Sequence, residues 1–437
     1  MDKSTICALP WVHRYTCVPG EAQVCCNSAN WIKDENGVVM TGATPDEAVM
    51  NSSALKKMRL EMTQGKWPAS CENCRMIEKH GSHSMRHVAN QRFSDVMDAI
   101  VKKTKKDGSI PVKVLSRDYR LGNTCNSACR MCDAWNSSLW EKDWPLVVSE
   151  GLRIGIDLNH SRKVEWYKNP EAWNGFENQV KSLRRLHFAG GEPMIVPQMI
   201  AALETCIRAG VSSQIDLSYN TNVTVIPTAV KKLWPQFKSV LLYASVDGFG
   251  PMNEYIRYPV SWKKIDANLK ELEADGNKFG VTDVWICCVV QAYNVLQMEP
   301  LFDYISKFRN IFPVVGINRL IQPEHLSTQV LPRELKELAK SRLLKYLDKT
   351  QRGIKTGEYP EQMCALPEKI HYVINDMFAE DRSHLFPKFL AEAKLLDRRR
   401  KQSLFDLVPE LSLGEKVSGR GSRKSPRCRA EASRPRS

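Results

Sequence analysis

The stretch LGNTCNSACRMCDAWNS, residues 121–137, sets three cysteines at the spacing C-x3-C-x2-C, directly after a strand-like run at 112–119. Three thiolates so close together can hold three irons of a 4Fe–4S cluster and leave the fourth iron without a protein ligand. Ordinary electron-transfer clusters take four cysteines, and a structural zinc site also takes four ligands. Cys125, Cys129 and Cys132 therefore predict a cluster with one open iron. The alternative is three core cysteines in a buried loop.

This loop resembles the signature of the radical S-adenosylmethionine (radical SAM) enzymes. The resemblance implies that S-adenosylmethionine chelates the open iron through its amino and carboxylate groups. Reduction of the cluster would then cleave this cofactor to methionine and a 5′-deoxyadenosyl radical. Met131, between the cluster cysteines, would be a flexible apolar contact for the adenine. The resemblance also implies a reductant such as flavodoxin or ferredoxin.

The composition of the 437 residues is that of a globular protein, with 43% hydrophobic and 26% charged residues. No run approaches the ~18 apolar residues of a membrane span. The first residues, MDKSTICALPWVHRY, lack the long apolar core of a signal peptide. These features predict the cytoplasm and no membrane partner. Clustered cysteines there suggest metal binding or catalysis rather than disulfides.

The net charge of +14 raises the question of an anionic partner such as nucleic acid. Residues 415–437 alone carry eight Lys or Arg against two Glu, which is +6. This tail, assigned to 411–437, is rich in Ser, Gly, Pro and Arg, and we expect it to be disordered. A solvated basic surface explains the charge better than a nucleic-acid site, although nucleic acid stays open as a partner.

The middle of the chain alternates β-branched apolar runs with helical stretches. The expected strands are 112–119, 186–189, 214–219, 240–246, 284–291 and 314–321, and the expected helices lie near 197–208, 226–235, 261–275 and 297–309. Strands alternating with helices imply parallel βαβ units. We predict an α/β fold, a partial (β/α)6 TIM-type barrel over 111–330, with its site at the C-terminal strand ends. A connecting helix at 86–110 precedes it, and a helical extension at 331–410 follows it.

The first 85 residues form a small cysteine-rich module of hairpin and helices. Their pattern, C-x12-G-x4-C with a distant C-x2-C, resembles the twitch domain, the shortened form of the SPASM auxiliary-cluster domain. The resemblance implies a second 4Fe–4S cluster on Cys7, Cys25, Cys71 and Cys74, although Cys26 competes with Cys25. In the best-known family members this domain follows the barrel, whereas here it precedes it. Four thiolates also suit zinc.

The second expected strand runs into Gly190-Gly191-Glu192-Pro193. Glycines past a strand let the backbone approach a ligand closely. A carboxylate beside them can accept charge-assisted hydrogen bonds from an ammonium group. In radical SAM enzymes the GGE motif binds the amino group of the cofactor, and a tight turn is the alternative.

Further resemblances place cofactor contacts at later strand ends. They imply roles for Asn222 after the third strand, Ser245 and Asp247 in the S-x-D-G motif, Arg257 on the cofactor carboxylate, and Gln291 near the adenine. A turn at Asn222 and a surface ion pair at Arg257 are the alternatives. Nothing in the sequence pairs His187 or His325 with a carboxylate, so neither receives a role.

The resulting hypothesis is a radical SAM enzyme that abstracts hydrogen from a peptide or protein. A small carbohydrate, a nucleoside or RNA is the alternative substrate. A different class is a non-catalytic iron–sulfur or zinc protein, acting as a scaffold or in electron transfer.

Overall fold

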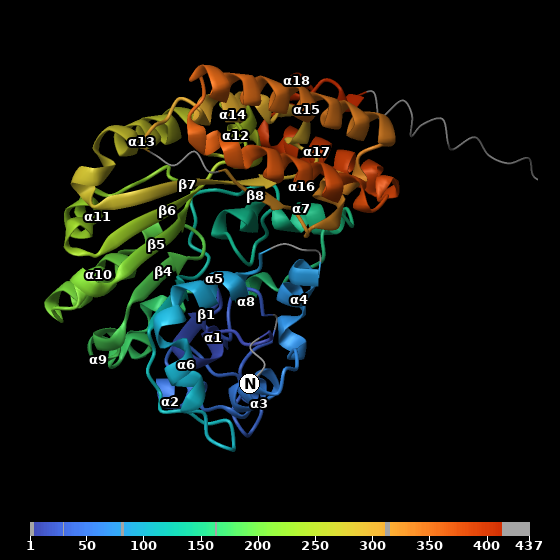
Figure 1. The fold of residues 1–437 in the computed structure, drawn as a ribbon. Helices are drawn as coiled ribbons and strands as arrows, with labels where there is room; N and C mark the ends of the chain where they lie inside the picture. Colours follow the sequence, from blue (N-terminus) through green and yellow to red (C-terminus); the bar gives the residue numbers. More distant parts are fainter. Residues whose placement is uncertain (1–3, 29, 80–82, 162–163, 311–314, 413–437) are drawn as a thin grey trace, which may run out of the picture.

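A curved eight-stranded sheet forms the centre of the molecule (Figure 1). The computed structural model describes residues 4–28, 30–79, 83–161, 164–310 and 315–412. The strand order is β2-β1-β3-β4-β5-β6-β7-β8. Neighbours from β1 to β8 run parallel, and β2 is antiparallel to β1. The strands are β1 (His13–Thr16), β2 (Ala22–Gln23), β3 (Ser116–Arg120), β4 (Arg185–Ala189), β5 (Asp216–Thr221), β6 (Ser239–Ser245), β7 (Val281–Val290) and β8 (Val315–Arg319).

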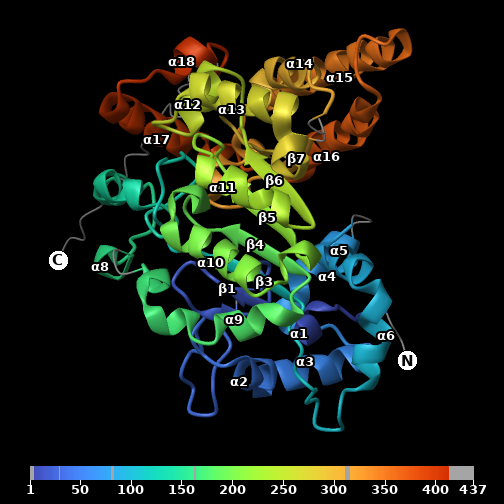
Figure 2. The same cartoon turned by 90° about the vertical axis from the view of Figure 1, so that its left-hand side faces the viewer.

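The predicted α/β fold with a partial TIM-type barrel is confirmed, since β3–β8 overlap the six expected strands. Residue 314, at the start of the last expected strand, lies outside the described residues. One side of the sheet is covered by α9 (Phe176–Gln179), α10 (Pro197–Arg208), α11 (Thr228–Leu233) and α13 (Trp262–Asp275) (Figures 1 and 2). Along β6, Val240, Leu242 and Ala244 are fully buried while the residues between them are half-buried. This period of two gives each strand a core face and an inner face.

The N-terminal module is joined to this sheet. Its helices are α1 (Leu9–Val12), α2 (Asp46–Met50), α3 (Ser53–Thr63) and α4 (Glu72–Lys79). Between α1 and α2, strand β1 pairs in parallel with β3, so that Tyr15 lies opposite Asp118. A separate module was expected from the sequence. Strand β1 has only four residues and no alternation of apolar and polar residues. The sequence therefore did not predict that this strand would extend the sheet of the barrel.

The connector at 86–110 differs from the single helix that was expected. It consists of α5 (Met85–Arg92) and α6 (Ser94–Lys102), separated by Phe93. Phe93 has φ −109° and ψ 20°, outside helical values, and its ring is buried. Burial of this side chain therefore accompanies the break between the two helices.

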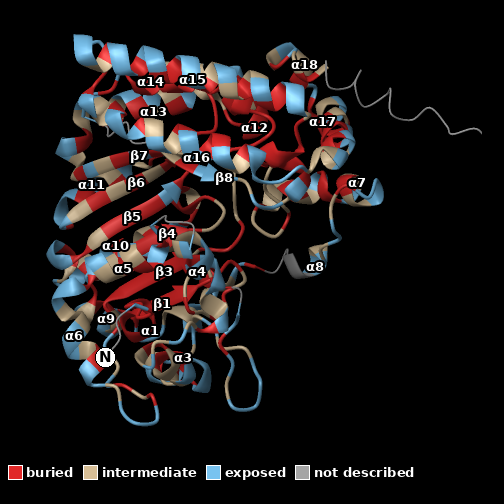
Figure 3. Ribbon diagram, turned by 45° about the vertical axis from the view of Figure 1, so that its right-hand side comes forward, coloured by how far each residue is buried: buried red, intermediate tan, exposed pale blue. Residues whose placement is uncertain are grey.

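The remaining helices lie near the carboxyl ends of the strands and beyond β8. Here α15 (Arg333–Thr356), α16 (Leu366–Ala379), α17 (Phe386–Arg400) and α18 (Leu404–Leu407) gather together at the top of Figures 1 and 2. The others are α7 (Trp144–Ser149), α8 (Leu158–Ser161), α12 (Pro251–Ile256) and α14 (Glu299–Ile305). In Figure 3 much of the sheet has the colour of buried residues, because these helices cover it. The expected tail lies outside the described residues from 413 onward.

Among the described helices, none combines the length and the apolar character that crossing a membrane would require.

Candidate functional site

The three central cysteines lie on the loop that follows β3, at the carboxyl edge of the sheet. The Ser127 hydroxyl lies between two of them, 3.3 Å from the Sγ of Cys125 and 3.5 Å from the Sγ of Cys129. Burial raises the pKa of Cys125 to about 11 and the pKa of Cys132 well above its usual value. Thiols in such surroundings ionise readily only with a compensating cation, and metal ligation requires the thiolate.

These cysteines do not close around a single ion. Among the described residues, no group of three or more His, Cys, Asp or Glu could hold one metal ion. A zinc ion needs all its sulfurs at about 2.3 Å. In a 4Fe–4S cluster each cysteine serves a different iron, so the sulfurs stand further apart. Cysteine thiolates are the donors that hold 4Fe–4S clusters, so the chemistry of the three thiols on the loop fits such a cluster.

The backbone of the cysteine loop is held by donors from outside it. Arg400 Nη1 donates to the carbonyl of Ala128 at 2.9 Å, and Trp140 Nε1 donates to that of Cys129 at 2.8 Å. Arg153 donates to the carbonyls of Arg130 and Cys132, at 2.6 and 3.4 Å. Since buried carbonyls need such partners, these contacts fix the path of the loop between its cysteines.

Helix α17 and the loop are joined by buried ion pairs. Arg130 pairs with Asp397 at 2.6 Å and lies over the ring of Tyr255, 3.6 Å from its centroid. Arg400 pairs with Asp143 at 3.0 Å. Removing one partner of a buried pair costs about 3–5 kcal/mol, because the other charge is left uncompensated. The C-terminal extension is thus part of the support of the site.

Glu392 of α17 is fully buried and interacts with two basic side chains. It pairs with Arg153 at 2.5 Å, and His325 Nε2 lies 2.7 Å from its other oxygen. Burial alone would raise the pKa of Glu392, but Arg153 and His325 lower it to about 2. His325 received no role from the sequence. The structure gives it a carboxylate partner 67 residues away.

The Gly-Gly turn after β4 lies directly against the cysteine loop. Gly191 N donates to the Gly122 carbonyl at 3.0 Å, and Glu192 N donates to the Thr124 carbonyl at 2.9 Å. A Cβ at Gly191 would come within 2.2 Å of the Thr124 oxygen, and Gly190 has a φ of +122°. The close approach expected of these glycines is therefore to the loop backbone.

The carboxylate of Glu192 is buried and accepts three hydrogen bonds. They come from the Met194 amide at 3.1 Å, the Thr221 hydroxyl at 2.8 Å and the Asn222 amide at 2.7 Å. Burial raises the pKa of Glu192 to about 7 against the lowering effect of these donors. Asn222 Nδ2 also donates to Asn126 of the cysteine loop at 2.6 Å. Glu192 and Asn222 are thus brought to the loop, as the sequence predicts.

The S-x-D-G segment meets the loop through Arg257. The Arg257 Nε lies 2.7 Å from Asp247, and its Nη1 donates to the Sγ of Cys129 at 3.8 Å. Asp247 is fully buried and also accepts from the Val289 amide at 2.8 Å. Asp247 therefore orients Arg257 toward Cys129 of the loop.

The other predicted contacts surround this centre. Ser245 ends β6 and is half-buried. Gln291 follows β7, is fully buried, and donates through Nε2 to the Val289 carbonyl at 3.3 Å. Met131 is partly buried against the main core.

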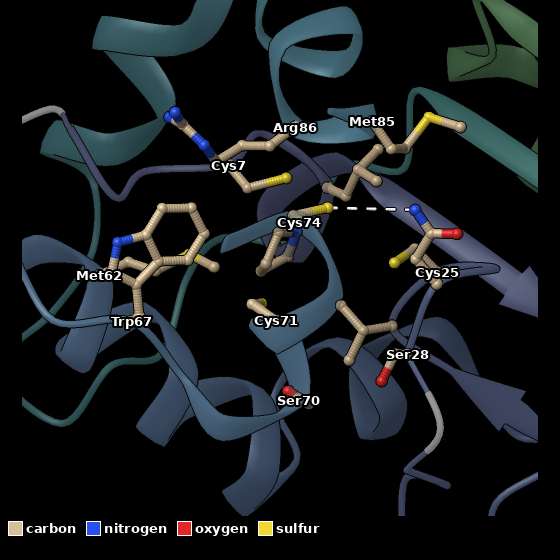
Figure 4. Close-up of a pocket in the computed structure, with 14 residues that line it drawn as sticks. Cys7, Cys25, Ser28, Met62, Trp67, Ser70, Cys71, Cys74, Met85 and Arg86 are labelled. Atoms are coloured by element: carbon tan, nitrogen blue, oxygen red, sulfur yellow. Dashed lines mark hydrogen bonds between the residues drawn. The ribbon is translucent and has the colours of Figure 1, made fainter. Parts of the chain in front are cut away.

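Four cysteines of the N-terminal module line one pocket, although they come from three separate segments (Figure 4). They are Cys7 before α1, Cys25 after β2, Cys71 at the start of α4, and Cys74 within it. Burial raises the pKa of Cys7 to about 12 and that of Cys71 to about 11. Cys26 does not line this pocket.

Several residues of the loop support were missed by the sequence analysis. The Arg130–Asp397 contact joins residues 267 positions apart, and the Arg153–Glu392 contact joins residues 239 apart. A basic residue in a cysteine motif is visible in the sequence, but its distant acidic partner carries no local signal.

Comparison with known proteins defines the class of the barrel. Residues 119–289 match the Radical SAM superfamily. These residues run from the end of β3 to the end of β7, so the similarity lies in the barrel and covers less than half of the chain. This superfamily works with a 4Fe–4S cluster and S-adenosylmethionine. No curated protein matches the chain.

Among solved structures, the chain is similar to native anSMEcpe with bound AdoMet and Cp18Cys peptide. The identity is 16%, the match covers 56% of this chain and 62% of that chain, and the TM-score is 0.37. It is also similar to Streptococcus suis SuiB bound to precursor peptide SuiA, at 13% identity, 76% and 72% coverage, and a TM-score of 0.36. The chain thus spans less than two thirds of the first of these proteins.

Proposed function

We propose that the protein is a radical SAM enzyme that abstracts hydrogen from a peptide or protein substrate. Cys125, Cys129 and Cys132 would hold the 4Fe–4S cluster. When bound, the cluster and S-adenosylmethionine supply a 5′-deoxyadenosyl radical once a reductant such as flavodoxin or ferredoxin delivers an electron. The observation that carries the proposal is the C-x3-C-x2-C loop with the GGE turn hydrogen-bonded onto it.

The surrounding residues of this chain hold and orient the cofactor. Glu192, with its carboxylate fixed by Thr221 and the Asn222 amide, accepts from the ammonium group of S-adenosylmethionine. Arg257 has five donors, and those beyond its contacts with Asp247 and Cys129 serve the cofactor carboxylate. Met131, Gly190, Gly191, Ser245 and Gln291 complete the cofactor site. Gln291 is fully buried, and such burial excludes water from a reactive radical.

The direct test is cofactor cleavage after anaerobic reconstitution with iron and sulfide. With S-adenosylmethionine and dithionite, the wild type is expected to release 5′-deoxyadenosine, and Cys129→Ala is expected to release none. Cys364→Ala is the matched control, because Cys364 is exposed and outside the loop. Equal cleavage by the wild type and Cys129→Ala would refute the proposal.

For the N-terminal pocket we propose a second, auxiliary 4Fe–4S cluster on Cys7, Cys25, Cys71 and Cys74. Support comes from the pocket that they share. It also comes from the donor set, because four cysteine thiolates are the usual ligands of such a cluster. The auxiliary cluster would pass electrons or help to place the substrate.

A further inference from the structure

The inner face of the sheet carries polar and aromatic side chains. In register, Asp118 of β3 lies opposite His187 of β4, which lies opposite Ser218 of β5. The next level toward the carboxyl edge holds Tyr243 of β6 beside Trp285 of β7. The opposite face of the same strands is apolar and fully buried, as at residues 186, 217 and 242. In a parallel sheet both faces are usually buried, so the polar side chains on this inner face require an explanation.

Two charged groups on this inner face lack the hydrogen bonds that burial demands. Asp118 is 8% exposed. Within the described part of the chain, its Oδ1 and the Nε of Arg120 are buried without a hydrogen-bond partner. A buried polar atom left unpaired costs about 1–3 kcal/mol. By contrast, the neighbouring His187 Nδ1 is satisfied, 2.8 Å from the Ser218 hydroxyl. The unpaired atoms at Asp118 and Arg120 therefore mark a place for a ligand.

The charge of this region is positive. Burial raises the pKa of Asp118, while Arg185 and Arg120 lower it, so both guanidinium groups lie near this one carboxyl. His187 is neutral, because burial and Arg185 hold its pKa well below the usual value. Two arginines against one aspartate leave an excess of one positive charge.

An aromatic surface adjoins the charged group. The rings of Tyr243 and Trp285 meet edge-on at 5.8 Å, and His187 contacts Tyr243 at 6.1 Å. Trp285 is 37% exposed although it lies in the middle of β7. A large aromatic ring open to solvent beside an unpaired charged site suits an apolar group of the same ligand.

We propose that this inner face binds an acidic peptide segment. Its carboxylate faces Arg120 and Arg185, its backbone N–H donates to Asp118, and an apolar side chain packs on Tyr243 and Trp285. The proposal rests on the proposed function, which puts the cofactor at the carboxyl ends of the same strands. Arg185 and Ala189 are four residues apart in β4, about 13 Å at the rise of a strand. A segment of about four extended residues would therefore reach from the deepest arginine to the cofactor.

A peptide fits this face better than a nucleotide does. A phosphate would gain from the arginines, as a carboxylate does, but it carries no N–H donor of its own for Asp118. In a peptide, a carboxylate and N–H donors lie within one or two residues of each other. The guanidinium donors of Arg120 and Arg185 and the carboxylate acceptor of Asp118 lie in neighbouring levels of the sheet, so they match that combination. Arginine is also suited to bind a carboxylate with two hydrogen bonds.

The test is binding selection by ultrafiltration with the reconstituted full-length protein and S-adenosylmethionine. The probe is a pool of acetylated hexapeptides, each containing one Glu or one Gln beside a Leu or Phe. The wild type is expected to retain the Glu peptides about 10- to 100-fold more than the Gln peptides, as for loss of a charge-assisted hydrogen bond. Arg120→Gln is expected to lose this preference. Arg184→Gln, whose side chain pairs with Asp95 near the start of β4, is the matched control and is expected to keep it.

Each result decides the proposal. Equal retention of Glu and Gln peptides by the wild type would overturn it, and so would a preference that survives Arg120→Gln. A preference lost equally in Arg184→Gln, or displacement of the peptides by uridine monophosphate, would also overturn it. Iron content shows that each variant is folded. Cofactor cleavage by the wild type without peptide is a separate readout, so failure of the proposed function would be seen independently of failure at this site.

Discussion

Glu392→Gln tests the support that the C-terminal extension gives to the cysteine loop. The substitution keeps the size of the side chain but removes the charge that faces Arg153 and His325. The pKa of Glu392 falls from the usual 4.5 to about 2 in the folded protein. Each unit is worth 1.36 kcal/mol, so the charge contributes about 3 kcal/mol to the free energy of unfolding near neutral pH.

Thermal unfolding is the assay. At about 2 °C or less per kcal/mol for a chain of this size, Glu392→Gln is expected to lower the melting temperature by about 5 °C. Glu380→Gln is the matched control, because Glu380 is exposed and its pair with Arg382 is a surface pair. Such pairs contribute about 0–1 kcal/mol, so this control is expected to melt close to the wild type.

The sign of the pH dependence follows from the lowered pKa. The stabilisation by ionised Glu392 is fully present above the unfolded pKa of about 4.5 and is lost as the pH falls toward about 2. The gap between the wild type and Glu392→Gln should therefore be widest near pH 7 and shrink below pH 4.5. A variant that melts with the wild type at pH 7, or a gap that widens in acid, would refute the reasoning.

Two further predictions concern the turn after β4. Gly191→Ala is expected to destabilise the protein by several kcal/mol, since its Cβ would meet the backbone oxygen of Thr124 at 2.2 Å. Gly155→Ala, with its nearest neighbour at 3.8 Å, should be tolerated in the same melting assay. Thr221→Val removes a donor that lowers the pKa of Glu192. It should raise that pKa above about 7 and weaken S-adenosylmethionine binding at pH 7 more than at pH 8.5, and equal weakening at both would contradict this role of Glu192.

The sequence predicted the strand ends that carry the candidate site motifs. The cysteine loop, the GGE turn and the S-x-D-G segment each sit at a strand end, and parallel strands bring those ends to one edge. The structure joins them through Asn222, Asn126 and Arg257. These contacts follow from strand order, which alternating strands and helices already imply.

The sequence could not predict the parts that depend on distant pairing. The contact between Arg153 and Glu392 needs the position of α17, which no pattern in the barrel specifies. The choice between Cys25 and Cys26 was equally out of reach, because adjacent cysteines fit the spacing equally well. In the structure Cys25 lines the N-terminal pocket, whereas Cys26 does not.

That separation predicts the iron content of two neighbouring variants. Two clusters would give about eight irons per chain. Cys25→Ala is expected to hold about four to five, while Cys26→Ala should keep about eight. Similar losses in both variants would contradict the assignment of Cys25 to the N-terminal pocket.

The open iron of the central cluster is the core of this account, and electron paramagnetic resonance tests it most directly. The double variant Cys71→Ala/Cys74→Ala removes two of the four cysteines that line the N-terminal pocket, so that the central cluster dominates the spectrum. After reduction by dithionite, the account predicts a 4Fe–4S signal whose g-values shift when S-adenosylmethionine is added. The further change Cys125→Ala should abolish the signal. A reduced cluster whose spectrum is unchanged by S-adenosylmethionine would contradict the account.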